Sequence, residues 1–158
     1  SKELKAVASK RKKTDDDYAE MSRIEWHAAL YVDRDGDLIL PSSLLESCIY
    51  DGAKKSKLGK AFKSAVFVND DAKLDIGVKK NAADLWGDAN YRDVRGVRVG
   101  QARVMRTRPV FRTWKCTLTV MFDPDQVNEG EVLRAIKDAG QNSGVGDFRP
   151  RFGRFEIK

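Results

Sequence analysis

The stretch VRVGQARVMRTRPVFRTWKCTLTVMF, residues 97–122, decides how the sequence is expected to fold. Its first part, 97–108, and its second part, 110–122, are rich in β-branched residues, and Pro109 separates them. From Trp114 to Phe122 every second residue is apolar, which is the period of two expected for a strand with one buried face. The stretch therefore predicts one long β-hairpin whose arms join around Pro109.

The segment VNEGEVLRAIKDAG, residues 127–140, carries the start and stop signals of a helix. Asn128 is placed as an N-cap with Glu131 three residues later, which is the spacing of a capping box. Val127 and Val132 have the spacing of a hydrophobic staple, and Gly140 supplies a stop. We expect a helix from residue 128 to this glycine.

Two further elements are expected before the hairpin. The apolar segment 24–32 predicts a first strand, which ends in a turn. A helix is expected to begin at Pro41 and Ser42, with Ser43 and Glu46 spaced as a capping box, and to fade near Gly52.

The order of elements predicts an α+β protein. Strands are also expected at 65–68 and 151–157, and the polar stretch 69–95 is expected to form an insertion. This order predicts a ferredoxin-like (RRM-like) βαββαβ core with an insertion and a long arginine-rich hairpin. Residues 1–20 are expected to form a mobile charged arm, and 21–158 a single domain.

Composition limits the classes of protein to which the chain could belong. It has 158 residues with a formal net charge of +6, which satisfies a weak screen for nucleic-acid binding. Cys48 and Cys116 lie in apolar patterns and are expected to be free thiols in a reducing compartment. No apolar run approaches a membrane span, so we expect a cytoplasmic protein without a membrane partner.

Arginine is concentrated in the hairpin. Its planar guanidinium donates two hydrogen bonds at once to a phosphate and stacks on bases. The alternative is a hairpin whose arginines are ion-paired with acids of the same chain. The residues expected to bind nucleic acid here are Arg103, Arg106, Arg108, Arg112 and Lys115.

Two other basic segments are candidates for the same role. The sequence KKSKLGK holds Lys54, Lys55, Lys57 and Lys60 and predicts a loop that contacts phosphate; it lacks the context of a P-loop. The ending GVGDFRPRFGRF places Arg149, Arg151 and Arg154 among Phe148, Phe152 and Phe155. Single-stranded nucleic acid uses such surfaces, because bases stack on rings while arginines follow the backbone. Phe155 is expected in the core, while Phe148 and Phe152 fit either role.

These segments resemble known proteins. The stretches RVMRTRPVFRTW and GVGDFRPRFGRFEI, with 40–66, resemble a group of uncharacterised phage and prophage proteins. More distantly, the element order and the glycine-rich turn resemble the RAMP superfamily, which includes RNA-binding backbone subunits of CRISPR complexes. That resemblance implies a groove for single-stranded RNA, with possible self-assembly along the strand, in the cytoplasm of a bacterial host.

Two other functions remain open from the sequence. A phage protein of this kind could block or mimic a host protein complex. The single histidine, His27, could act with Tyr31 or Lys54 in a metal-independent endoribonuclease, although a packed strand residue is favoured. Asp33, Asp35 and Asp37 lack the downstream glutamate of a calcium loop and predict a turn, so neither a metal nor a cofactor is expected.

Overall fold

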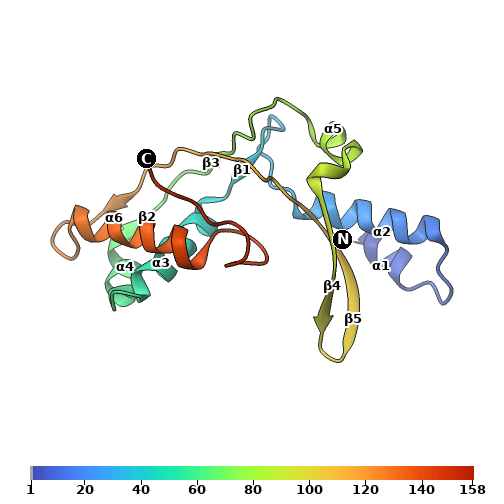
Figure 1. Ribbon diagram of the computed structural model, residues 1–158, viewed down its shortest axis with the longest axis horizontal. Coiled ribbons are helices and arrows are strands. Elements are labelled where there is room, and N and C mark those ends of the chain that lie inside the picture. Colours follow the sequence, from blue (N-terminus) through green and yellow to red (C-terminus); the bar gives the residue numbers. More distant parts are fainter. Residues whose placement is uncertain (1) are drawn as a thin grey trace. The chain divides into compact units, whose positions relative to one another are not determined.

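The computed structural model describes residues 2–158 and has the mixed α+β composition that the sequence predicts. The chain forms two compact units, residues 1–39 with 74–115 and residues 40–73 with 116–158. Among the described residues the strands form three two-stranded sheets, in the orders β1-β3, β2-β6 and β4-β5. The ferredoxin-like arrangement is not confirmed, because no sheet of four strands joins these pairs (Figure 1).

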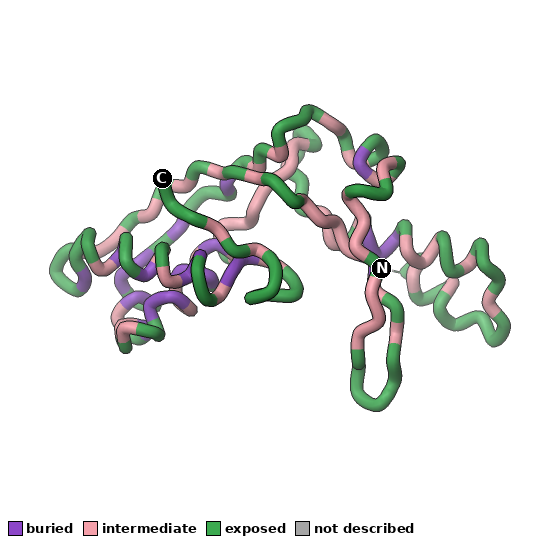
Figure 2. Tube along the Cα trace, viewed as in Figure 1, coloured by how far each residue is buried: buried purple, intermediate pink, exposed green. Residues whose placement is uncertain are grey.

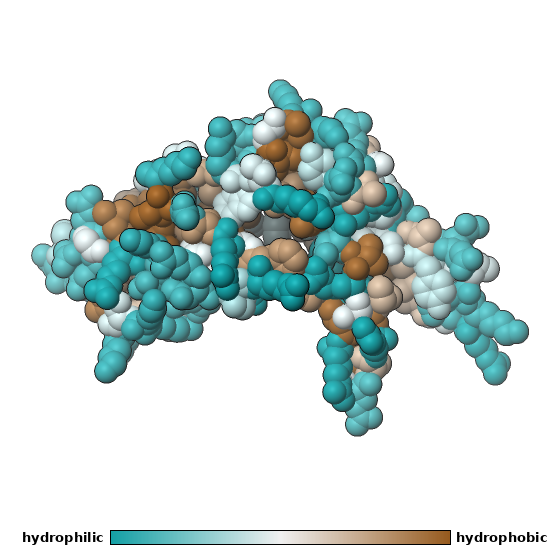
Figure 3. Space-filling view, in the orientation of Figure 1, coloured by the Kyte–Doolittle hydropathy of each residue, from teal (hydrophilic) through white to brown (hydrophobic). Residues whose placement is uncertain are grey.

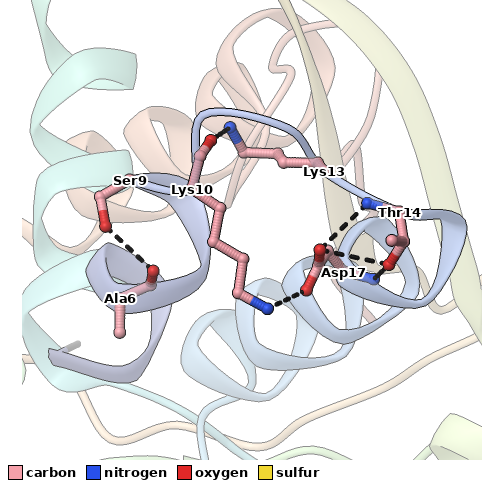
Figure 4. A network of polar contacts seen from close by, with 6 residues as sticks. All are labelled: Ala6, Ser9, Lys10, Lys13, Thr14 and Asp17. Atoms are coloured by element: carbon pink, nitrogen blue, oxygen red, sulfur yellow. Dashed lines mark hydrogen bonds and ion pairs between the residues drawn. The ribbon is translucent and has the colours of Figure 1, made fainter.

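The first unit begins with two helices, α1 (Lys2–Ala8) and α2 (Asp15–Ala29). Thr14 caps α2: its hydroxyl accepts from the Asp17 N–H, and the Asp17 carboxylate accepts from the Thr14 N–H (Figure 4). The Lys10 ammonium pairs with the same carboxylate, and these contacts lower the pKa of Asp17. The chain is therefore helical on both sides of residue 20, where the sequence predicted the end of an arm.

The strand predicted at 24–32 is wrong, because residues 24–29 lie in the second half of α2 and only Val32 forms a β-bridge, with Leu38. Ile24, Glu25 and Trp26 are its buried residues, and the Trp26 indole donates to the Tyr91 carbonyl at 2.9 Å. In the sequence, this run of three adjacent core residues resembles part of a buried strand. The polar residues 15–22, which supply the rest of the helix, carry too little apolar periodicity to indicate it.

Part of the predicted insertion packs against α2. This part contains α5 (Ala82–Gly87) and a 3₁₀ turn η1 (Ala89–Tyr91), whereas the short strand β3 (Ala72–Lys73), earlier in the insertion, belongs to the second unit. Leu85 of α5 is fully buried, and the ring of Trp86 lies 5.7 Å from that of Trp26 at a steep angle. These aromatic contacts form the core of the first unit.

The predicted hairpin exists, but its turn is elsewhere. β4 (Arg92–Val99) and β5 (Ala102–Pro109) pair antiparallel, and Gly100 and Gln101 form the turn between them. Gly100 has φ +60°, which favours glycine at the first position of a two-residue hairpin turn. Pro109 ends the second strand, so the prediction that it joins the arms is wrong.

The segment 110–122 is not the second arm of that hairpin. Its alternation between exposed and half-buried residues is observed from Thr113 to Met121. Within it, however, only an isolated bridge between Lys115 and Asp75 and the short strand β6 (Met121–Phe122) are paired. The pattern predicted the alternation correctly and the pairing incorrectly.

The second unit is built on α3 (Ser42–Lys54) and α4 (Gly59–Ala65), with β2 (Val66–Phe67) paired to β6. Short strand β1 (Ile39–Leu40) precedes α3. The capping box predicted at Ser43 is wrong, because α3 has no side-chain cap and the Glu46 carboxylate accepts from the Val68 N–H. The predicted lysine loop is observed over residues 55–58, which form a turn between α3 and α4, while Lys54 and Lys60 lie in the two helices.

Helix α6 (Glu129–Asp138) confirms the strongest sequence signal. The Asn128 side chain accepts from the Glu131 N–H at 3.0 Å, and Glu131 accepts from the Asn128 N–H at 2.9 Å. A π-helical turn, η2 (Ala139–Ser143), extends the helix past the expected stop at Gly140. The strand predicted at 151–157 is wrong, because these residues form no strand and lie along η2 instead.

Among residues 2–158, none of the helices combines the length and the apolar character needed to cross a membrane.

Candidate nucleic-acid interface

A closed loop at residues 145–153 follows η2 in the second unit. Its neck is a hydrogen bond from the Val145 N–H to the Gly153 carbonyl at 2.9 Å, and inside it the Phe152 N–H donates to the Phe148 carbonyl. Gly153 has φ +72°, and a Cβ there would lie 1.8 Å from the Val145 oxygen. Glycine is therefore required for the loop to close in this form.

The loop presents the predicted arginines and two phenylalanines together. Every residue from Asp147 to Phe152 is exposed, and the whole-residue exposures of Phe148 and Phe152 are 36% and 37%. Phe155 is half-buried where its backbone N–H donates to the Gly140 carbonyl. The two phenylalanines whose role the sequence left open thus lie at the surface, whereas Phe155 lies against η2.

Phe148 has an unusual backbone conformation. Its φ is +55°, in the left-handed region that bulky side chains rarely adopt. Among the described residues other than glycine, only Lys57, with φ +61°, shares this feature. Backbone strain of this kind is concentrated at ligand-binding and catalytic sites.

Helix α3 contributes cations beside the loop. The Asp51 carboxylate pairs with the Lys54 ammonium at 2.8 Å and with the Arg149 guanidinium at 3.6 Å. The hydrogen bond from Lys54 raises the pKa of that ammonium, which also lies 4.5 Å from the centre of the Tyr50 ring. Two segments that the sequence identified separately, 54–60 and 149–154, therefore meet at one carboxylate.

The remaining predicted residues of this unit are distributed around that point. Lys55 pairs with Asp138 at 3.3 Å, and Lys57 and Lys60 are exposed. The Arg154 guanidinium donates to the Pro150 carbonyl at 2.8 Å and so ties the end of the loop to its middle. Arg151 is exposed at the loop's surface.

A buried thiol fastens the loop to α3. Cys48 is 1% exposed, and its thiol donates to the Gly144 carbonyl at 3.1 Å. Burial raises the pKa of this thiol to about 11. Both cysteines are free; Cys116 is half-buried, and burial raises its pKa as well.

The hairpin of the first unit carries the other predicted cations. The strand register places Arg95 opposite Arg106 and Arg98 opposite Arg103. Like charges directly opposite each other destabilise a strand pair. Acids compensate the first pair, because Arg95 binds Asp93 and Arg106 binds Glu25.

Glu25 anchors the hairpin to α2. It is buried, and its carboxylate accepts from the Arg106 guanidinium and from the Thr107 N–H, the latter at 3.1 Å. Arg106, which the sequence predicted to contact phosphate, therefore helps to hold the hairpin against α2. Arg112 donates to the Asn90 carbonyl at 2.8 Å, Arg108 donates to the Thr107 carbonyl, and Lys115 pairs with Asp75.

The second unit also contains a pocket that none of the predicted residues lines. It has a volume of about 230 Å³ and lies between α3 and α4, over the buried side chains of Ile49, Phe62 and Val66. Its polar wall comprises Ser43, Glu46, Ser47, Tyr50 and Lys63. Of these, Ser43 and Glu46 were expected to form a capping box, and no sequence pattern indicated the pocket.

The residues considered for catalysis show different surroundings. His27 lies on α2 beside the Trp26 ring, at 5.0 Å between centres, and burial followed by the Arg23 charge lowers its pKa. Lys54 belongs to the other unit, where Asp51 holds it.

Asp33 accepts from the backbone N–H groups of Asp35 and Asp37, which confirms the predicted turn. Within residues 2–158, no group of three or more histidine, cysteine or acidic side chains is arranged to hold a metal.

Comparisons with known proteins add no relative: no family model, no curated protein and no solved structure matches this chain.

Proposed function

We propose that the chain binds single-stranded nucleic acid through the surface formed by the loop 145–153 and the end of α3, mainly by contacts to phosphates. The observation that carries the proposal is the loop itself, which offers Phe148 and Phe152 at its surface together with Arg149 and Arg151. Stacking of a base on an aromatic side chain contributes about 1–3 kcal/mol per base and tolerates any sequence.

The backbone of the loop supports this role. A φ of +55° at Phe148 costs on the order of 1–3 kcal/mol, and strain of this kind is typical of binding sites. The neck at Gly153, the Arg154 contact and the Cys48 thiol hold the loop in this form before any ligand binds. A loop fixed in advance loses less entropy on binding.

From the sequence resemblance alone, we further propose that the chain is a phage protein that acts in the cytoplasm of a bacterial host. We also propose that it is not an enzyme, because its single histidine, His27, allows no histidine pair.

Fluorescence anisotropy with labelled single-stranded RNA and DNA, titrated at several salt concentrations, tests the proposal. The double variant Arg149→Gln/Arg151→Gln is expected to weaken binding to every sequence by about tenfold or more and to lower the salt slope by about 1.4, because each phosphate contact to a single strand contributes about 0.7. Arg134→Gln/Lys137→Gln, on exposed positions of α6, removes the same charge from the same unit and is the matched control.

A second pair of substitutions isolates stacking. Phe148→Leu/Phe152→Leu keeps the charge and the apolar character and removes the rings, so affinity is expected to fall while the salt slope stays unchanged. If neither loop variant differs from the α6 control, the proposal fails and a protein partner becomes the better hypothesis.

A further inference from the structure

The tip of the hairpin holds two cations without a compensating acid. Arg98 and Arg103 lie directly opposite each other, so their side chains share one face of the ribbon. The Arg98 guanidinium donates to the Gly100 carbonyl at 3.2 Å, and the Arg103 guanidinium lies against Gly96. Within residues 2–158, no acid is within ion-pair distance of either arginine.

The neighbouring arginine pair shows how acids of the same chain can neutralise such a repulsion. Arg95 and Arg106 are equally opposed, and Asp93 and the buried Glu25 pair with them. The uncompensated pair at the tip therefore leaves a concentrated positive charge that an external anion would stabilise.

The ribbon that carries this charge extends beyond its anchor. Its base is held at Thr107, which is 1% exposed, and from Thr107 to Ala102 five residue steps reach roughly 17 Å. The tip lies clear of α1 and α2 and is exposed on both strands (Figures 1 and 2). Hydrophilic side chains line much of this part of the ribbon, with apolar ones among them (Figure 3).

The composition of the ribbon distinguishes between kinds of anion. The segment 92–109 holds no aromatic residue, so the hairpin lacks the stacking platform with which proteins bind single strands. The major groove of B-form DNA, about 12 Å wide and 8.5 Å deep, admits a two-stranded ribbon. A ribbon free over roughly 17 Å is long enough to enter it.

We infer that the hairpin is a second nucleic-acid contact, which enters the groove of duplex DNA with Arg98 and Arg103 bound to phosphates or base edges near its tip. This contact goes beyond the proposed function, because it takes a different ligand and uses residues of a different unit. A-form RNA, whose major groove is deep and narrow, does not admit such a ribbon.

The test is the affinity of the full chain for a labelled 20-base-pair DNA duplex. Arg98→Gln/Arg103→Gln is expected to weaken duplex binding by about tenfold or more and to leave single-strand binding unchanged. Arg11→Gln/Arg34→Gln removes the same charge from exposed positions of the same unit and is expected to have a much smaller effect. Thermal unfolding of the tip variant is expected at the same or a higher temperature, because a like-charge pair has been removed.

Equal losses in the two arginine variants would overturn the inference, since net charge would then explain both. Binding of duplex RNA as tightly as duplex DNA would overturn entry into the groove. A tip variant that loses single-strand and duplex binding together would show one shared site and would also contradict the inference. Failure of the loop 145–153 to bind single strands would leave these duplex measurements unaffected.

Discussion

The hairpin of the first unit and the loop 145–153 of the second present arginine in two different ways. The hairpin is regular backbone, anchored to α2 by one buried carboxylate, and its cations compete with each other across the strands. The loop is irregular backbone closed through Gly153, and its cations are interleaved with exposed phenylalanines. Both regions have more arginines than acids, so the backbone and the aromatic residues are what separate their proposed ligands.

The comparison also shows where each region is vulnerable. The loop depends on backbone geometry, because its neck requires a glycine. The hairpin depends on side-chain electrostatics, because Glu25 satisfies both a guanidinium and a backbone N–H. Substitutions of these anchors are therefore expected to damage one region each.

The largest effect is expected for Gly153→Ala. Its Cβ would lie 1.8 Å from the Val145 oxygen at a φ of +72°, so the neck must open, and the free energy of unfolding is expected to fall by about 2–5 kcal/mol. Gly146→Ala is the control, because Gly146 also has a positive φ but nothing lies within 4 Å of its Cβ position. Its expected cost is about 1–2 kcal/mol. Chemical denaturation of both variants measures the difference, and equal losses would contradict the role of the neck.

The next effect is expected for Glu25→Ala. This change leaves the buried Thr107 N–H without its acceptor and Arg106 without its acid, so we expect a loss of about 2–4 kcal/mol. The control is Glu20→Ala, which removes the carboxylate that pairs with Arg23 on the exposed face of the same helix. No measurable change in the free energy of unfolding is expected. Hydrogen exchange at the backbone amides of β5 measures directly how firmly Glu25 anchors this strand. Unchanged protection in Glu25→Ala would refute the anchoring role of Glu25.

A smaller effect is expected for Cys48→Ala, which removes the thiol that donates to the Gly144 carbonyl. The expected loss is about 1–2 kcal/mol, accompanied by weaker single-strand binding, because the loop loses its attachment to α3. Cys48→Ser keeps a donor and is expected to restore part of the affinity. In the unchanged chain, the pKa of about 11 and the burial predict that Cys48 reacts with a thiol reagent at pH 8 only after unfolding.

The smallest effect concerns pH and the first unit. Burial lowers the pKa of His27 below its ordinary value of 6.5, so between these two values the unfolded chain binds more protons than the folded chain. The free energy of unfolding is therefore expected to decrease as the pH falls below 6.5. The contribution of the neutral His27 side chain is fully present above that pH. Denaturation at pH 7 and pH 5.5 measures the change, and His27→Gln is expected to reduce it; the same pH dependence in that variant would assign it to another group.

The sequence predicted elements best where local signals decide the structure. The capping box at Asn128 and the turn at Asp33 were predicted correctly, because a side chain bonds to a backbone group within a few residues. Strand pairing was predicted poorly: the arms were expected to join around Pro109, because the apolar alternation beyond it resembles a second arm, whereas Gly100 and Gln101 form the turn. Which strand a residue pairs with depends on distant segments, and alternation carries no information about it.

The same distinction holds for the candidate site. Composition identified Arg149 and Arg151 as candidate binding residues and left the role of Phe152 open, and all three are exposed. It gave no indication that Asp51 joins Lys54 to Arg149, or that Glu25 engages Arg106, since both contacts join segments far apart in the sequence. The uncompensated pair at Arg98 and Arg103 likewise becomes visible only once the register is known.

Affinity for a labelled single-stranded oligonucleotide, measured across salt concentrations for the unchanged chain, for Arg149→Gln/Arg151→Gln and for Arg98→Gln/Arg103→Gln, tests the central claim most directly. Each variant removes two arginines, so net charge is matched. The account predicts that the loop variant loses about tenfold or more in affinity and that the hairpin variant binds like the unchanged chain. Equal affinity of the two variants, or a loss confined to the hairpin variant, would contradict it.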